Sequence, residues 1–321
     1  MKKYKVIFMG TPHIAMTALN ALFQKYDVCL VISQPDKEKD RKGNYVYSAV
    51  KQYCLSHNLP LLQPIKVKEA LAKIQELTPD LIVTCAYGQF IPSSILNIPK
   101  YKSVNLHASL LPRWRGAAPM QWAILSGDNK TGLTLMYMDK FMDHGNIIAT
   151  IPIQLTPLQT NYSELYSMME NAVVEMINTK FDNLFSDHVI SQVQDESLVT
   201  LAPIITKEQL VINWDQEGKT IINHINAFAN EPLAITYLND YQFKIGKALF
   251  KPNNFENQAI ANGTVLKCDK QELVIKVKDG TISILTVQPQ NKKMLPIKAF
   301  LNGNNLIHMN DQFKKNKSEA K

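Results

Sequence analysis

The chain has 321 residues, which is enough for two domains of ordinary size. Its composition, 45% hydrophobic and 20% charged, is that of a soluble globular protein. Its net charge of +7 suits an anionic partner but names none. No apolar run approaches the ~20 residues of a membrane span, and the one near the N-terminus is too short for a signal sequence. We therefore expect a cytoplasmic protein with no membrane contact.

The first part of the chain reads as alternating strands and helices. An apolar run at 5–9 predicts a strand, apolar residues at helical spacing predict a helix over 14–23, and a second strand follows at 28–32. This spacing is typical of a parallel strand–helix–strand unit. Only Gly10 stands where a dinucleotide-binding turn has three glycines, so the turn gives little support to NAD binding.

Further strands are expected at 81–86, 104–108 and 131–138, and a long helix over 163–184. In open α/β sheets, ligands bind beyond the carboxyl ends of the strands. We expect the three strand exits after Ala86, His107 and Met138 to converge there. Asn105 and His107 would then share a cleft with one or more residues of the 139–146 loop, namely Asp139, Asp143 and His144.

Asn105 and His107 are the first candidates for chemistry. Strand alternation places both on one face, about 7 Å apart. An amide can donate to an oxyanion, a protonated imidazole can stabilise the same charge and relay a proton, and a carboxylate can orient the imidazole. These groups suit acyl transfer to an amine, although satisfied polar groups in a buried strand remain an alternative. A metal site built from His107, Asp143 and His144 is another alternative, but no ligand motif supports it, and we expect no metal.

No nucleophile is evident in this region. Ser109 lacks the strand–turn–helix context of a nucleophile elbow, and Cys85 lies within a predicted strand. Direct attack by a substrate amine is therefore simpler than a covalent intermediate.

The sequence becomes more polar and less regular after about residue 185. A polar stretch to about 205 reads as a linker, and short strand-like runs follow at 263–267, 273–277 and 282–287, separated by turn residues. This pattern predicts antiparallel hairpins in a small barrel or sandwich. Residues 201–321 hold 16 lysines against 11 acidic residues, a bias that fits either a solvated surface or a nucleic-acid surface.

Motifs along nearly the whole chain resemble those of the methionyl-tRNA formyltransferase family. In order, they are MGTP (9–12), QPD (34–36), AYGQFIP (86–92), NLHASLLPRWRGAAP (105–119), QWAILSGD (121–128), MD (142–143) and APIITKEQLVINW (202–214). The SLLPRWRG segment alone marks the wider group that uses 10-formyltetrahydrofolate. QWAILSGD and the C-terminal segment narrow the resemblance to the tRNA enzymes.

The resemblance implies an α/β fold: a Rossmann-like N-terminal domain with a mostly parallel sheet, followed by a small OB-like β-barrel. The expected bounds are 1–188 for the formyltransferase domain, 189–205 for the linker, 206–310 for the tRNA-binding domain and 311–321 for a disordered tail. It also implies formyl transfer from 10-formyltetrahydrofolate to the α-amine of initiator methionyl-tRNA, which releases tetrahydrofolate. We expect a monomer.

Site residues follow from the same motifs, position by position. The catalytic set implied is Asn105, His107 and Asp143. The folate-binding set implied is Ser109, Leu110, Leu111 and Pro112, with Ala86, Tyr87, Gly88 and Gln89 lining the pterin pocket. Arg41 and Lys42, in the polar loop over 36–51, are implied to contact the tRNA acceptor end.

The chain departs from the family pattern at several positions. His13 replaces a usual Asp, and Glu38 and Asp40 make the loop around Arg41 more acidic. DHGN at 143–146 replaces a usual DTGD, and NAFANEPLAIT at 226–236 replaces a segment bearing Arg and Trp. Two other functions stay open: a formyltransferase for a small amine, such as a nucleotide sugar or purine precursor, and a non-catalytic RNA-binding protein.

Overall fold

The computed structural model describes residues 4–36, 45–186, 188–253, 260–303 and 306–315. It divides into two compact units. The first comprises Met1–Pro119, Lys130–Gln154 and Tyr166–Pro203, and the second comprises Met120–Asn129, Leu155–Leu165 and Ile204–Lys321. The first unit thus continues past residue 188, its expected end, because the chain over 192–202 packs onto it.

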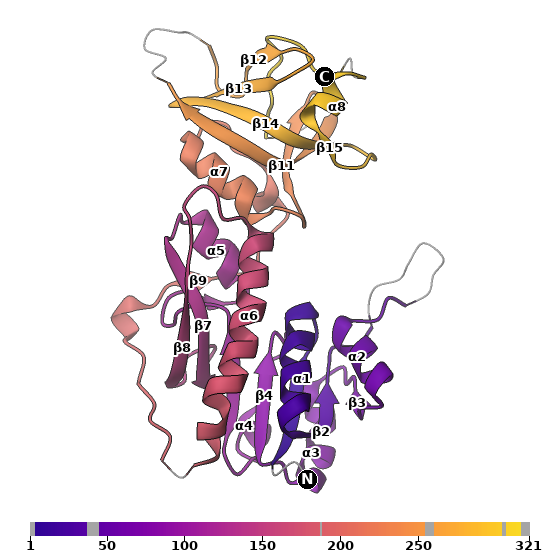
Figure 1. Ribbon diagram of the computed structural model, residues 1–321, viewed down its shortest axis with the longest axis vertical. Coiled ribbons are helices and arrows are strands. Elements are labelled where there is room, and N and C mark those ends of the chain that lie inside the picture. The colour runs from indigo at the N-terminus through magenta and orange to yellow at the C-terminus, as the bar shows by residue number, and fades with distance from the viewer. Residues whose placement is uncertain (1–3, 37–44, 187, 254–259, 304–305, 316–321) are drawn as a thin grey trace. The chain divides into compact units, whose positions relative to one another are not determined.

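The first unit is built on a mostly parallel sheet with strand order β3-β2-β1-β4-β5-β7-β8 (Figure 1). The strands are β1 (Lys5–Gly10), β2 (Asp27–Ile32), β3 (Leu61–Leu62), β4 (Leu81–Cys85), β5 (Ser103–His107), β7 (Lys130–Tyr137) and β8 (Ile147–Gln154). Strands β1 to β5 run parallel, whereas β7 runs antiparallel to both of its neighbours. The mostly parallel sheet predicted from the sequence is confirmed.

Helices cover both faces of this sheet. Ile7 and Met9 of β1 pack with Ile74 and Ile95 from two of the helices. Helix α1 (His13–Lys25) contacts the same strand through its buried side, and Figure 1 shows this helix in front of the sheet. Buried apolar side chains on both faces explain why these strands read as continuous apolar runs. The helices are α1 (His13–Lys25), α2 (Ala49–His57), η1 (Val67–Ala70), α3 (Leu71–Leu77), α4 (Ser93–Leu96), α6 (Tyr162–Lys180), η2 (Phe181–Phe185) and η3 (Glu196–Leu198).

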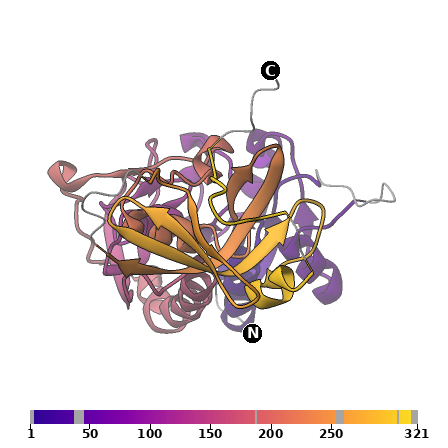
Figure 2. The ribbon, with the colours of Figure 1, turned by 90° about the horizontal axis from the view of Figure 1, so that it is seen from above.

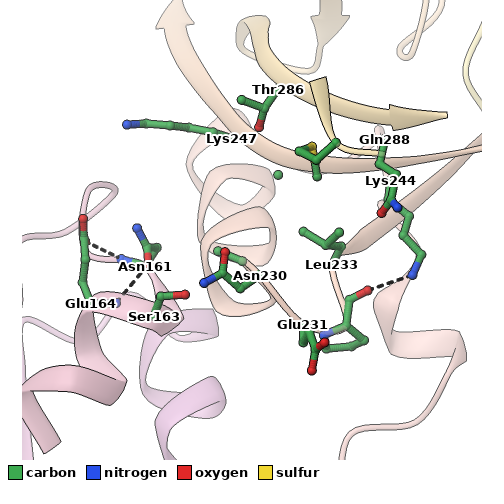
Figure 3. Close-up of a pocket in the computed structure, with 14 residues that line it drawn as sticks. Asn161, Ser163, Glu164, Asn230, Glu231, Leu233, Lys244, Lys247, Thr286 and Gln288 are labelled. Carbon is green, nitrogen blue, oxygen red and sulfur yellow. Dashed lines mark hydrogen bonds between the residues drawn. The ribbon is translucent and has the colours of Figure 1, made fainter. Parts of the chain in front are cut away.

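The second unit is an antiparallel sheet with strand order β10-β11-β14-β13-β12, and β15 pairs with β14. Its orange and yellow strands are seen from the side in Figure 1 and from above in Figure 2. Its elements are α5 (Pro119–Leu125), η4 (Glu208–Leu210), α7 (Gly218–Ala227), β10 (Ala234–Leu238), β11 (Tyr241–Pro252), β12 (Val265–Cys268), β13 (Leu273–Val277), β14 (Gly280–Pro289), β15 (Leu295–Pro296) and α8 (Ile297–Leu301). Its core is apolar, and side chains from the sheet, α7 and α8 fill it.

The last described residues join the two edges of this sheet. Lys314 pairs with Tyr237 of β10, and Gln312 pairs with Thr264 beside β12. The sheet therefore closes into a barrel, as the resemblance implied. The expectation that 311–321 forms a disordered tail is wrong for 311–315, because Phe313 is only 2% exposed and packs in the barrel core.

Phe313 tests this closure. Its ring lies against Trp214 and Phe243, so Phe313→Ala should leave a cavity and lower the free energy of unfolding by about 3–5 kcal/mol. Urea unfolding measures the change. Met309→Ala, at a side chain that is 60% exposed, is the control and should change stability by no more than about 0.5 kcal/mol. Equal effects of the two substitutions would show that the segment does not close the barrel.

Candidate active site

The site lies on β5, at the place where strand direction changes. Cys85 at the end of β4 pairs with Leu106, so β4 and β5 end at the same edge of the sheet. Strand β7 is antiparallel, and Tyr137 near its end pairs with Val104. The prediction that three strand exits meet is therefore wrong for β7, which ends toward the start of β5.

Asp143 nevertheless reaches the site, because the loop between β7 and β8 folds back. Asp143 has a left-handed backbone, with φ of 49°. Two residues later, a Cβ on Gly145 would lie 2.0 Å from the Tyr137 carbonyl oxygen. The loop thus follows its own strand so closely that only glycine fits at residue 145.

Asn105, His107 and Asp143 come together as predicted. The Asn105 amide donates to Asp143 Oδ1 at 3.4 Å, and His107 Nδ1 lies 3.5 Å from Asp143 Oδ2. The backbone N–H of Gly116 donates to the same Oδ2 at 2.9 Å. The Asp143 side chain is only 14% exposed, so these groups replace the water that an ionised carboxylate needs.

The imidazole of His107 is held at both nitrogens. Its Nε2 lies 2.9 Å from the Trp114 carbonyl oxygen, which can only accept a hydrogen bond. Its Nδ1 faces the Asp143 carboxylate. A doubly protonated ring can donate to both groups, whereas a neutral ring held in this way donates only at Nε2.

The amide of Asn105 is oriented from β4. Thr84 donates its hydroxyl to Asn105 Oδ1 at 2.7 Å, which fixes the NH₂ group on the side of Asp143. One N–H is directed at Asp143, and the other meets no acceptor among the described residues. The site therefore presents an oriented amide donor next to a buried imidazole.

Asp139 and His144 do not join this group. They pair with each other at 2.6 Å, and His144 Nε2 faces Glu196 at 3.6 Å. Within the described ranges, no group of three or more His, Cys, Asp or Glu side chains is placed to hold a metal ion.

Comparison with known proteins shows the family of this chain. The Formyl transferase family matches residues 2–179, and the Formyl transferase, C-terminal domain family matches residues 204–305. The methionyl-tRNA formyltransferase of Ureaplasma parvum is 43% identical, over 94% of this chain and 98% of its own. That of Malacoplasma penetrans is 38% identical, over 95% of each. The chain belongs to the methionyl-tRNA formyltransferase family.

The fold is shared more widely. The N-formyltransferase of Helicobacter canadensis, solved in complex with folinic acid and dTDP-3-aminofucose, superposes with a TM-score of 0.67 at 18% identity, over 89% of this chain and all of its own.

Among the described residues, no helix is long and apolar enough to cross a membrane.

The loop after β5 carries the residues that the sequence motifs predict to contact folate, and the side chain of Ser109 in it is bonded within the loop. Ser109 is fully buried and donates its hydroxyl to the Arg113 carbonyl at 2.6 Å. Leu111 is also buried, and a cis peptide joins it to Pro112. Ser109 thus shapes the loop, while Leu110 is partly exposed.

The segment Ala86–Gln89 leaves β4 at the edge where β5 ends. Ala86 and Gly88 have left-handed backbones, with φ of 47° and 82°. The Tyr87 ring packs in the core, and burial raises the pKa of its hydroxyl to about 12, so it is neutral at physiological pH. Gln89 accepts from the Val67 N–H at 2.9 Å. The Tyr87 ring is therefore part of the core rather than of a ligand surface.

Arg41 and Lys42 lie outside the described residues, so tRNA contact there stays a prediction.

Gln194 is a residue of the site that was not predicted from the sequence. It is 5% exposed and donates to two carbonyls of the Asp143 loop. Nothing in its polar surroundings distinguishes it from a linker residue.

Two threonines on β7 give a matched test of the loop after β5. The Thr134 hydroxyl donates to the Ser109 carbonyl at 2.6 Å and accepts from the Leu111 N–H at 3.2 Å. The Thr131 hydroxyl is equally buried but meets no partner among the described residues. Thr134→Val should cost about 1–3 kcal/mol, because it leaves two buried backbone groups unpaired, while Thr131→Val should be neutral or stabilising.

Denaturant unfolding of the two variants measures this difference. Equal destabilisation by both substitutions would contradict the role assigned to Thr134.

Proposed function

We propose that this chain transfers the formyl group of 10-formyltetrahydrofolate to the α-amino group of methionine on initiator methionyl-tRNA, giving N-formylmethionyl-tRNA for translation initiation. The observation that carries the proposal is the convergence of Asn105, His107 and Asp143 in a chain similar to this family over nearly its full length. No metal is needed for the steps below.

The reaction exchanges one carbon–nitrogen bond for another. The methionyl amine attacks the formyl carbon and forms a C–N bond, and the formyl oxygen takes up negative charge in the tetrahedral intermediate. Collapse then breaks the bond between the formyl carbon and N10 of the folate. The amine loses one proton and N10 gains one, which leaves tetrahydrofolate.

Asn105 would stabilise the oxyanion through its N–H that meets no acceptor among the described residues. Thr84 holds the amide in the donor orientation before substrate arrives, so little reorganisation is needed. Removal of one such donor typically costs about 10²–10³ in rate.

His107, when doubly protonated, would stabilise the same charge through its own positive charge, because its two ring nitrogens already face Asp143 and the Trp114 carbonyl. Asp143 would keep the ring oriented through Nδ1. The Trp114 carbonyl fixes the other edge of the ring, so the imidazole cannot turn away from Asp143 without losing a buried hydrogen bond.

The loop over 109–112 and the segment over 86–89 are the proposed folate contacts. The second unit is the proposed tRNA surface, supported by the surplus of lysines over residues 201–321. A formyltransferase for a small amine remains the alternative, but a small amine needs no such second surface.

A transfer assay separates these functions. With 10-formyltetrahydrofolate and charged initiator tRNA, the protein should form formyl-methionine, and initiator methionyl-tRNA should react faster than the elongator form. Free methionine and amino sugars should show no transfer. Transfer to an amino sugar but not to tRNA would favour the small-amine function, and RNA binding without folate binding would favour the non-catalytic one.

The two histidines near Asp143 give a matched test of the catalytic group. His107→Ala should lower the single-turnover rate by about 10²–10³-fold, because it removes a group that stabilises the charge of the intermediate. His144 lies in the Asp143 loop but faces Asp139, so His144→Ala should change the rate by no more than about fivefold. Circular dichroism checks that both variants keep their fold. A near-wild-type rate for His107→Ala would overturn the assignment.

A further inference from the structure

The chain over 194–202 was expected to be part of a linker, yet it is built into the active-site unit. Strand β9 (Leu201–Ala202) pairs with β6 (Arg115–Gly116), which follows the site loop. The buried side chain at its start is Gln194, a residue type that is seldom fully buried without hydrogen-bond partners.

Gln194 holds the backbone that carries Asp143. Its Nε2 donates to the Asp143 carbonyl at 2.8 Å and to the Gly145 carbonyl at 2.9 Å. Both amide protons are therefore used on one turn of the loop, on either side of His144. This turn is the one that must fold back from the far end of β7 and hold Asp143 at a positive φ.

Arg115 sets the orientation of the Gln194 amide. Its Nε and Nη2 donate to Gln194 Oε1 at 3.0 and 2.8 Å. Since a guanidinium only donates, the oxygen must face Arg115 and the NH₂ must face the two carbonyls. Glu196 binds the same guanidinium through both carboxylate oxygens, which keeps Arg115 in place.

The same segment supports the imidazole side of the site. The Thr200 hydroxyl accepts from the Trp114 N–H at 2.9 Å, and the Thr200 carbonyl accepts from the Arg115 N–H at 2.9 Å. The carbonyl of that same Trp114 accepts from His107. Residues 194–202 thus bind both the loop that carries Asp143 and the Trp114–Arg115 backbone, whose Trp114 carbonyl binds the His107 ring.

We propose that Gln194 is a positioning residue for formyl transfer, which holds Asp143 against His107 and Asn105 through its two hydrogen bonds to the Asp143 loop. The proposal rests on the proposed function for its rate readout, and on the fold alone for its exchange readout. Gln194 binds the backbone of the Asp143 loop, and it acts on the reaction through Asp143.

The first test replaces the amide donors. Gln194→Glu keeps the acceptor for Arg115 but turns a carboxylate oxygen toward two carbonyls, and Gln194→Met removes both interactions at similar length. Both should lower kcat by about 100-fold with KM for folate and tRNA changed by no more than about threefold. Gln192→Glu, the same change at an exposed side chain two residues away, is the control and should leave kcat unchanged.

The second test asks whether Gln194 acts through Asp143. In an Asp143→Ala background, Gln194→Glu should lower the residual single-turnover rate by less than about threefold, because the group it positions is gone. A full 100-fold loss in both backgrounds would mean a general structural role and would overturn the proposal.

A readout without activity separates this proposal from the assigned reaction. The Gly116 N–H donates to Asp143 Oδ2, so its hydrogen exchange in the protein without substrates reports the position of the carboxylate. Gln194→Glu and Gln194→Met should speed this exchange by about tenfold or more, with Gln192→Glu unchanged. Unchanged exchange in both Gln194 variants would overturn the proposal even if the enzyme transfers formyl. Faster exchange in a protein that transfers no formyl would support the positioning and contradict the reaction.

Discussion

The site depends on satisfying one carboxylate that is largely removed from water. Taking an ionised carboxylate out of water costs several kcal/mol unless polar protein groups replace its hydration. Asp143 finds these in the Gly116 N–H, the Asn105 amide and the His107 ring. Because each partner comes from a different point on β5 or the chain after it, the carboxylate fixes their relative positions.

The direction of β7 explains why this arrangement needs outside support. Because β7 runs antiparallel to β5, the loop after β7 starts beside the beginning of β5. The Asp143 loop must therefore return along its own strand to reach His107. Its tight backbone leaves two carbonyls facing inward, and Gln194 satisfies both of them. A segment far along the chain therefore completes a site that the β5 and β7 loops cannot hold alone.

Much of this was predictable from the sequence because it depends on local pattern. Alternation on β5 placed Asn105 and His107 on one face, apolar runs located the parallel strands, and motif resemblance supplied Asp143. The direction of β7, the burial of Gln194 and the packing of Phe313 depend on contacts between distant segments. A polar stretch and a charged terminus carry no periodic signal of such contacts, and Arg41 lies outside the described residues.

The most direct test of the account is the protonation of the His107 ring, because its hydrogen bond to the Trp114 carbonyl requires a proton on Nε2. Nitrogen-15 chemical shifts of labelled histidine, with the His107 signals identified by their absence in His107→Gln, report each ring nitrogen separately. We predict that Nε2 stays protonated at every pH at which the protein transfers formyl. An unprotonated Nε2 under those conditions would contradict it.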